Sequence, residues 1–315
     1  MPSPFLNAAD SPETVVSSFY SALQHEVNRG NPFLDDAEQE RLREHHPFIL
    51  DPGNYPPGLV AALHNRRRIA PVKAIRESSA PLVLDAGCGC GSDSILFAAL
   101  GASVVAVNIF SEELLVAEKR ARYYEKIGGG KLNIRFIQAD LNDYIPGEEN
   151  FSLTWFASVL AVIRDQESLL KRVFQATRDH GRIMLVDYNL LHPPFLWKEW
   201  RRRNAVREKC PDFVREGHFW KMFRRKGRTG ARFFPLAEGG IFDDAQFFTP
   251  GTLGALLQRA GFRVLPAVFS GCTLPVFSGP AVCLERALSR APGWKSLGRA
   301  YLLTGMKEES AGRSV

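Results

Sequence analysis

An acidic residue and three glycines alternate with other residues in the segment VLDAGCGCG, at Asp85, Gly87, Gly89 and Gly91. Glycine lets a ligand approach the backbone closely, and a helix that begins after such a loop offers unpaired N–H donors. A dinucleotide loop would need glycine at Ser92, and the chain has no Gly-Lys-Ser/Thr phosphate loop. A carboxylate two residues before the first glycine suits a cationic ligand group better than a pyrophosphate.

The elements that must position these residues alternate between strand and helix. Ser111 is expected to cap a helix that Gly128 stops, and another helix should run from Asp165 to Gly181. We expect the strands of this region at residues 82–86, 103–108, 134–138, 151–156 and 182–187. The alternation predicts an α/β fold, a doubly wound and mostly parallel sheet with its ligand site at the carboxyl ends of the strands.

Helices precede this alternation. Ser11 as cap and Pro12 at the first helical position begin a helix that Gly30 ends. Two more helices are expected at residues 36–44 and 58–77. Residues 1–80 are therefore predicted to form an N-terminal helical lid.

An irregular segment at residues 190–248 follows the fifth strand. Thr249 and Pro250 then begin a helix that Gly261 closes. Strands near 262–268 and 299–307 should bring the sheet to seven strands, with a helix near 281–290. The predicted core thus comprises residues 81–189 and 249–310, with 190–248 as a cap over it.

The loop DAGCGCG resembles the first motif of class I S-adenosylmethionine-dependent methyltransferases, which read D/E-x-G-x-G-x-G. The segments QADLNDY, FSLTWFASVLAVIRD and FTPGTLGALLQRAGF are similar to later parts of these enzymes, and GRIMLVDYN resembles their fifth strand. About half of the chain takes part in the resemblance. It implies the Rossmann-like methyltransferase fold, S-adenosyl-L-methionine as cofactor and methyltransferase activity.

The resemblance also implies cofactor contacts. The acid at Asp85 is linked to the ammonium end of the cofactor, and the acid at Asp140 contacts the adenine amino group. The strand and turn at residues 151–165 lie under the methionine portion. The implied cofactor-binding residues are Asp85, Gly87, Cys88, Gly89, Gly91, Asn108, Ile109, Asp140, Leu141, Phe156 and Ala157.

Asn108 departs from the family pattern, which usually has Asp or Glu there on the ribose hydroxyls. An amide oxygen still accepts a hydrogen bond, but without the assistance of charge. We expect weaker cofactor binding, and we expect Asn108→Asp to tighten it if the residue reaches the ribose. A decayed site, or a site for another ligand, is the alternative reading.

Methyl transfer from a sulfonium is an in-line displacement, which needs alignment and a desolvated pocket. A general base helps when the acceptor is a hydroxyl. The candidate catalytic residues are Asp187, His192 and His218, and the candidate substrate-binding residues are Tyr188, Asn189, Arg201 and Trp220. Asp187 could instead cap a turn, and each histidine could be structural or solvated.

Several methyltransferase types fit the sequence poorly. The Asn/Asp-Pro-Pro-Tyr/Phe motif of amino-methylating nucleic-acid enzymes is replaced by FASV, and Tyr188 interrupts the Asp-Asn pair of metal-dependent enzymes. Cys88 and Cys90 lie in the cofactor loop, whereas cytosine-carbon methylation needs a cysteine on the acceptor side. The five cysteines form no C-x-x-C pair, so we expect neither a metal site nor a framework of disulfide bonds.

The segment at residues 190–248 indicates the kind of acceptor. It holds thirteen Lys or Arg against seven Asp or Glu, a net charge of +6, together with three tryptophans and nine phenylalanines. Such a composition suits a small-molecule or lipid-like acceptor, including one with an anionic group, and peripheral contact with acidic lipids. We expect O-methylation in a biosynthetic pathway. An RNA methyltransferase, a non-catalytic S-adenosylmethionine-binding scaffold, and an ordinary solvated cap are the alternatives.

The first residues lack the basic start and apolar core of a signal peptide, so we expect a cytoplasmic protein. Residues 264–284 carry no charge and are long enough to span a membrane, but three prolines and two glycines make a buried strand and loop the better reading.

Overall fold

Strands and helices alternate through most of the computed structural model, which describes residues 10–46, 57–144, 150–189, 231–232, 246–270 and 300–309. The helices are α1 (Pro12–Arg29), α2 (Asp36–His45), α4 (Pro57–Arg76), α5 (Ser92–Ala99), α6 (Ser111–Gly128), α7 (Gln166–Ala176) and α11 (Pro250–Ala260), with a 3-10 turn η1 (Leu160–Val162). The strands are β1 (Leu82–Ala86), β2 (Ser103–Asn108), β3 (Ile134–Gln138), β4 (Phe151–Ala157), β5 (Thr177–Tyr188), β6 (Ala231–Arg232), β7 (Gln246–Phe247), β8 (Arg263–Val264), β9 (Val268–Ser270) and β10 (Ala300–Met306).

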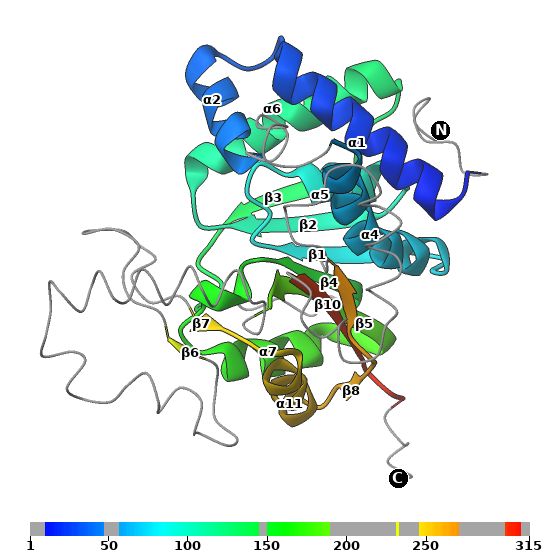
Figure 1. The fold of residues 1–315 in the computed structure, drawn as a ribbon, viewed down its shortest axis with the longest axis vertical. Helices are drawn as coiled ribbons and strands as arrows, with labels where there is room; N and C mark the ends of the chain where they lie inside the picture. Colours follow the sequence, from blue (N-terminus) through cyan, green and yellow to red (C-terminus); the bar gives the residue numbers. More distant parts are fainter. Residues whose placement is uncertain are drawn as a thin grey trace, which may run out of the picture.

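One large sheet organises the fold (Figure 1). Its strand order is β3-β2-β1-β4-β5-β10-β8, and β9 also pairs with β10. Strands β1 to β5 run parallel, whereas β10 is antiparallel to β5, β8 and β9. The strand order reverses direction between β1 and β4, which is where ligands bind in sheets of this kind. The predicted doubly wound, mostly parallel α/β fold is confirmed.

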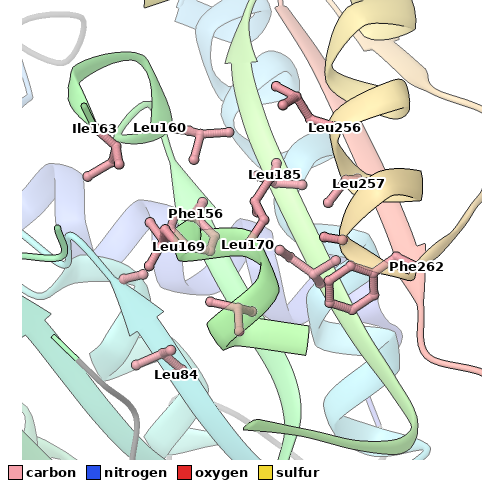
Figure 2. Packing of buried hydrophobic residues seen from close by; sticks show 14 of the residues in the cluster. Leu84, Phe156, Leu160, Ile163, Leu169, Leu170, Leu185, Leu256, Leu257 and Phe262 are labelled. Atoms are coloured by element: carbon pink, nitrogen blue, oxygen red, sulfur yellow. The ribbon is translucent and has the colours of Figure 1, made fainter. Parts of the chain in front are cut away.

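Helices cover both faces of the sheet. Val83 and Trp155 point into a core that also contains residues of α1, α4 and α5, including Val16, Val72 and Ile95. The next residue along β1, Leu84, points to the opposite face. There it packs in a cluster with α7, α11 and Phe262, which follows α11; Figure 2 shows Leu169, Leu170, Leu256, Leu257 and Phe262. Strands with both faces buried read as continuous apolar runs, as β1 and β2 do.

The predicted starts of α1 and α11 are confirmed by their caps. Ser11 accepts a hydrogen bond from the N–H of Thr14, and Thr249 accepts one from the N–H of Thr252. The predicted cap of α6 is wrong. Phe110 is the N-cap there, no side chain caps the helix, and the left-handed residue that ends it is Gly129 instead of Gly128.

The boundary between α7 and β5 also differs from the prediction. The helix ends at Ala176, and β5 begins at Thr177 rather than at residue 182. Gly181 is not a helix stop. It lies in a bulge of β5, where a side chain would stand 2.8 Å from the carbonyl oxygen of Phe151. Because a bulge brings two backbones close together, it requires glycine here for packing.

The strand expected near residues 262–268 is divided into β8 and β9. Pro266 lies between them and has no N–H to donate to β10, so the ladder is interrupted. Most of residues 190–248 and the helix expected at 281–290 lie outside the described residues. Among the residues that are described, no helix is long and apolar enough to cross a membrane.

Candidate functional site

The loop after β1 is held tightly against β2. The N–H groups of Gly87 and Cys88 both donate to the carbonyl oxygen of Val107, at 2.8 and 3.0 Å. Gly87 has φ +78°, and a Cβ atom on it would stand 2.3 Å from the side chain of Val159. Gly91 has φ +76° and is the N-cap of α5. The loop therefore requires glycine both for its backbone angles and for its close contacts.

Asp85 lies at the end of β1, buried under this loop. Its carboxylate accepts a hydrogen bond from the hydroxyl of Ser94 at 2.5 Å. Burial, together with the negative charge of Asp93, raises the pKa of Asp85 to about 7. A nearby cationic group would favour the charged form of this carboxylate, so the position suits an ammonium ligand.

Asp93, in the first turn of α5, has partners of its own. Arg68 of α4 donates to one carboxylate oxygen at 2.5 Å, and the indole N–H of Trp155 donates to the other at 2.9 Å. Burial raises the pKa of Asp93, but the charges of Arg68 and Arg67 and these hydrogen bonds outweigh it, and the pKa is lowered. The two buried acids therefore differ: Asp93 is neutralised by an arginine, whereas Asp85 has a hydroxyl partner.

Asn108 ends β2, and its side-chain amide is engaged. The amide nitrogen donates to Glu113 at 2.7 Å and, at 3.4 Å, to the carbonyl oxygen of Phe110. Glu113, in the first turn of α6, is not among the site residues predicted from the sequence. Its contact changes the expectation for Asn108→Asp, because a second carboxylate would face Glu113.

His45, at the end of α2, covers the same region. Its Nε2 lies 3.0 Å from Glu113 Oε1, and its ring stands 2.9 Å from the point that a Cβ atom on Gly89 would occupy. Burial lowers the pKa of His45, but hydrogen bonds to Cys90 and Glu113 outweigh this and raise it to about 10. A histidine with such a pKa carries a positive charge at neutral pH.

Asp140 and Leu141 follow β3 in a turn at the same edge of the sheet. One carboxylate oxygen of Asp140 accepts from the N–H of Asn142 at 2.8 Å and from its side-chain amide at 2.7 Å. Leu141 is buried, and Ile109 after β2 is 36% exposed. These hydrogen bonds within the turn hold Asp140 beside the ends of the strands.

The ends of β4 and β5 meet beside the glycine loop. Phe156 pairs with Leu185 and Ala157 with Val186, and the N–H of Ser158 donates to the carbonyl oxygen of Val186 at 2.8 Å. Ser158 has φ +60°, a left-handed angle that is uncommon in residues other than glycine.

Asp187 and Asn189 are buried at the end of β5. Asp187 pairs in register with Tyr301 of β10, and its charge adds to the burial that raises the pKa of the Tyr301 hydroxyl. Tyr188 belongs to β5, but its side chain is not described. His192, His218, Arg201 and Trp220 lie outside the described residues.

The described residues contain no group of three or more His, Cys, Asp or Glu that could hold a metal ion. The structure thus brings Asp85, the glycine loop, Asn108, Asp140, Ala157 and Asp187 to the carboxyl edge of five neighbouring parallel strands.

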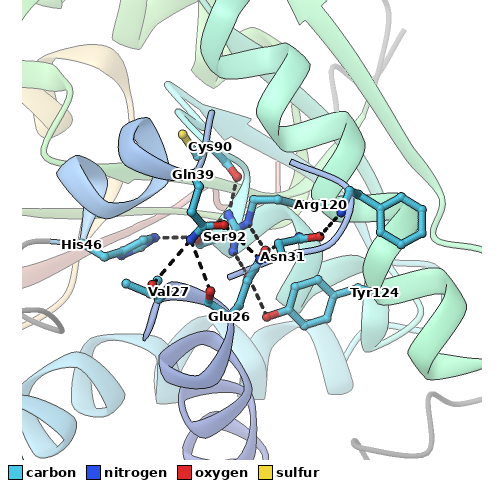
Figure 3. A network of polar contacts seen from close by, with 10 residues as sticks. Glu26, Val27, Asn31, Gln39, His46, Cys90, Ser92, Arg120 and Tyr124 are labelled. Atoms are coloured by element: carbon cyan, nitrogen blue, oxygen red, sulfur yellow. Dashed lines mark hydrogen bonds and ion pairs between the residues drawn. The ribbon is translucent and has the colours of Figure 1, made fainter. Parts of the chain in front are cut away.

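A buried polar network fastens the N-terminal helices to this edge (Figure 3). Arg120 of α6 forms two hydrogen bonds with Glu26 of α1, both at 2.8 Å, and donates to the carbonyl oxygen of Cys90 and the hydroxyl of Ser92. Tyr124 donates to Glu26 at 3.0 Å. The network connects α1, α6 and the glycine loop through buried hydrogen bonds.

Comparison with known proteins identifies relatives of this fold. The profile of a methyltransferase domain family matches residues 77–228. A structure of an S-adenosylmethionine-dependent methyltransferase from Methanosarcina mazei is similar with a TM-score of 0.50 and 17% identity, covering 74% of this chain and 95% of that one. Another from Mesorhizobium loti gives a TM-score of 0.47 and 17% identity, covering 76% and 97%. No curated protein matches the sequence.

Proposed function

Because the chain belongs to the class I S-adenosylmethionine-dependent methyltransferases, we propose that it transfers a methyl group from this cofactor to a hydroxyl of a small or lipid-like acceptor. The observation that carries the proposal is that Asp85 with the glycine loop and Asp187 lie at the carboxyl ends of the parallel strands β1 and β5, on either side of β4. Asp85, which shares one face of the sheet with Trp155, is assigned to the methyl donor, and Asp187, which shares the other face with Tyr301, is assigned to the acceptor.

The residues present fit the cofactor. Asp85 would hold its ammonium group, Asp140 the adenine amino group, and Asn108 lies where the ribose is expected. When bound, S-adenosylmethionine supplies a methyl group on a positively charged sulfur, and its loss leaves a neutral thioether. The glycine loop and the ends of β4 would exclude water and align the acceptor, which are the main needs of such a displacement.

Asp187 is proposed as the general base. It is 2% exposed at the end of β5, one strand removed from β1 across β4. A carboxylate in such surroundings can take the proton of an acceptor hydroxyl as the oxygen attacks the methyl group. His192 and His218 remain further candidates for this role, and Tyr188, Asn189, Arg201 and Trp220 for acceptor binding.

The acceptor class rests on the composition of residues 190–248. A net charge of +6 among twelve tryptophan and phenylalanine residues favours an acceptor with an anionic group and an apolar part. The same charge would favour RNA, which makes an RNA methyltransferase the second candidate. A membrane-associated lipid is the third form of acceptor compatible with this surface.

Calorimetry tests whether the protein binds the methyl donor. Binding of S-adenosylmethionine and S-adenosylhomocysteine is expected, and no heat with either at millimolar concentration would refute the proposal. Transfer of a labelled methyl group can then be measured to hydroxylated fatty acids and phenolic acids, to anionic vesicles, and to total RNA. Label in the RNA fraction alone would replace the small-molecule acceptor by the second candidate.

Asp187→Asn tests the general base. We expect kcat to fall about 100-fold or more, as for loss of a positioned base, with unchanged cofactor affinity. Asp179→Asn is the matched control, because Asp179 lies on the same strand at the end remote from the site and is half exposed. Equal rates for both variants would remove Asp187 from the catalytic role.

A further inference from the structure

The end of β2 lacks the charge expected there. In nucleotide-binding parallel folds, an acid about 20 residues after the first glycine receives the ribose hydroxyls. Asn108 stands 21 residues after Gly87 and is a neutral amide. A ribose-bearing ligand at this edge would therefore meet no carboxylate on β2 itself.

The orientation of the Asn108 amide is set by its neighbours. Its nitrogen faces a carboxylate oxygen of Glu113 and a backbone carbonyl, which are both acceptors, so the NH2 group must point toward them. Asn108 thus holds the side chain of Glu113 in place, five residues further along the chain.

Glu113 reaches the glycine loop. Its Oε2 lies 3.7 Å from the point that a Cβ atom on Gly89 would occupy, and its side chain is 15% exposed. The other oxygen, Oε1, is bound by His45. Burial raises the pKa of Glu113, but its bonds to His45 and Asn108 outweigh this and lower it. The carboxylate is therefore charged at neutral pH.

The two oxygens of Glu113 are only partly used. A carboxylate can accept about four hydrogen bonds, and the contacts with Asn108 and His45 take two. A ribose offers two adjacent hydroxyl donors. We propose that Glu113, carried on α6, replaces the missing acid of β2 and binds the vicinal diol of the cofactor's ribose, with Asn108 and His45 as positioning residues. This inference rests on the proposed function.

Ligands with and without the diol provide the test. Calorimetry would compare S-adenosylhomocysteine with its 2′-deoxy and 3′-deoxy analogues. For the wild type, loss of a hydroxyl should weaken binding about tenfold, as for a charge-assisted hydrogen bond. For Glu113→Gln, binding of the parent ligand should weaken about tenfold or more, and the difference between parent and deoxy ligands should shrink to about threefold or less.

Glu112→Gln is the matched control. Glu112 occupies the same turn of α6, carries the same charge and is exposed, so this variant should keep the wild-type discrimination. Thermal unfolding would verify that both variants are folded. A Glu113→Gln variant that loses affinity equally for parent and deoxy ligands, or loses none, would overturn the inference.

Asn108→Asp gives a second test. With Glu113 in place, the new carboxylate would face an existing one, so we expect no tighter binding. Tighter binding of the parent ligand by tenfold, with discrimination intact in Glu113→Gln, would assign the diol to position 108 instead. If the wild type binds none of the ligands, the proposed function itself fails, which is a distinct result.

Discussion

The buried pair of Arg120 and Glu26 allows a quantitative test of how the N-terminal helices stabilise the fold. Both side chains are fully buried and joined by two hydrogen bonds of 2.8 Å (Figure 3). Arg120→Met leaves Glu26 with Asn31 and Tyr124 as donors but without a counter-charge. Breaking a buried ion pair from one side costs about 3–5 kcal/mol of unfolding free energy.

The double variant tests whether Glu26 and Arg120 act as a pair. Glu26→Gln alone strands the charge of Arg120 and should cost a similar amount, about 3–5 kcal/mol. Independent costs would sum to about 6–10 kcal/mol in Glu26→Gln/Arg120→Met. A shared pair instead predicts a double variant no worse than either single one, which is a coupling of about 3–5 kcal/mol. Urea unfolding followed by circular dichroism measures all four proteins. Additivity within about 0.5 kcal/mol would refute the reasoning.

An exposed ion pair serves as the control for the buried one. Lys171 and Glu167 lie one helical turn apart in α7, and their side chains are 55% and 40% exposed. Lys171→Met should cost about 0.5 kcal/mol or less, because an exposed pair is screened by water. The contrast with Arg120→Met separates burial from charge as the cause.

Three further outcomes are expected. Gly87→Ala should destabilise the protein and weaken S-adenosylhomocysteine binding, because its Cβ would stand 2.3 Å from Val159. Gly101→Ala has φ +90° but open space around it, so it should lower the free energy of unfolding in urea by only about 1 kcal/mol. The pKa of His45 is raised to about 10, so its charged form stabilises the fold fully below the ordinary pKa of 6.5, and this contribution of about 1 kcal/mol is lost as the pH rises to 10. Melting curves should show that His45→Gln removes this dependence of stability on pH. Since the pKa of Asp85 is raised to about 7, calorimetry should find S-adenosylmethionine bound more tightly at pH 8 than at pH 6, and a pH-independent affinity would contradict the ammonium contact.

The sequence predicts the central fold well, because its signals there are local. The bounds of β1, β2 and β3 match the expected residues, since β1 and β2 are short, mainly apolar runs and β3 alternates apolar with polar residues at its start, each bounded by loop residues. The start of β5 was wrong because Gly181 has two local readings, helix stop and bulge, and only the packing against Phe151 distinguishes them.

Only the part of the candidate site that lies within one sequence motif could be predicted. Asp85 and the glycine loop lie within seven residues of one another, whereas Glu113 meets His45 from an element 68 residues away. A charge in the first turn of a helix is explained locally by the helix dipole, so nothing in the sequence indicated its contact with α2. Contacts of this kind depend on how the elements pack.

The pairing of Glu26 with Arg120 also has a consequence for the order of events during synthesis. The two residues are 94 positions apart, and α1 leaves the ribosome long before α6. At about 5–20 residues per second, Glu26 waits roughly 5–20 s for its partner. During that interval, burying Glu26 would leave its carboxylate without a counter-charge, which costs free energy. We therefore expect burial of Glu26 to be completed only after α6 has been made, which would fix the first helix of the chain late among the elements of the N-terminal half.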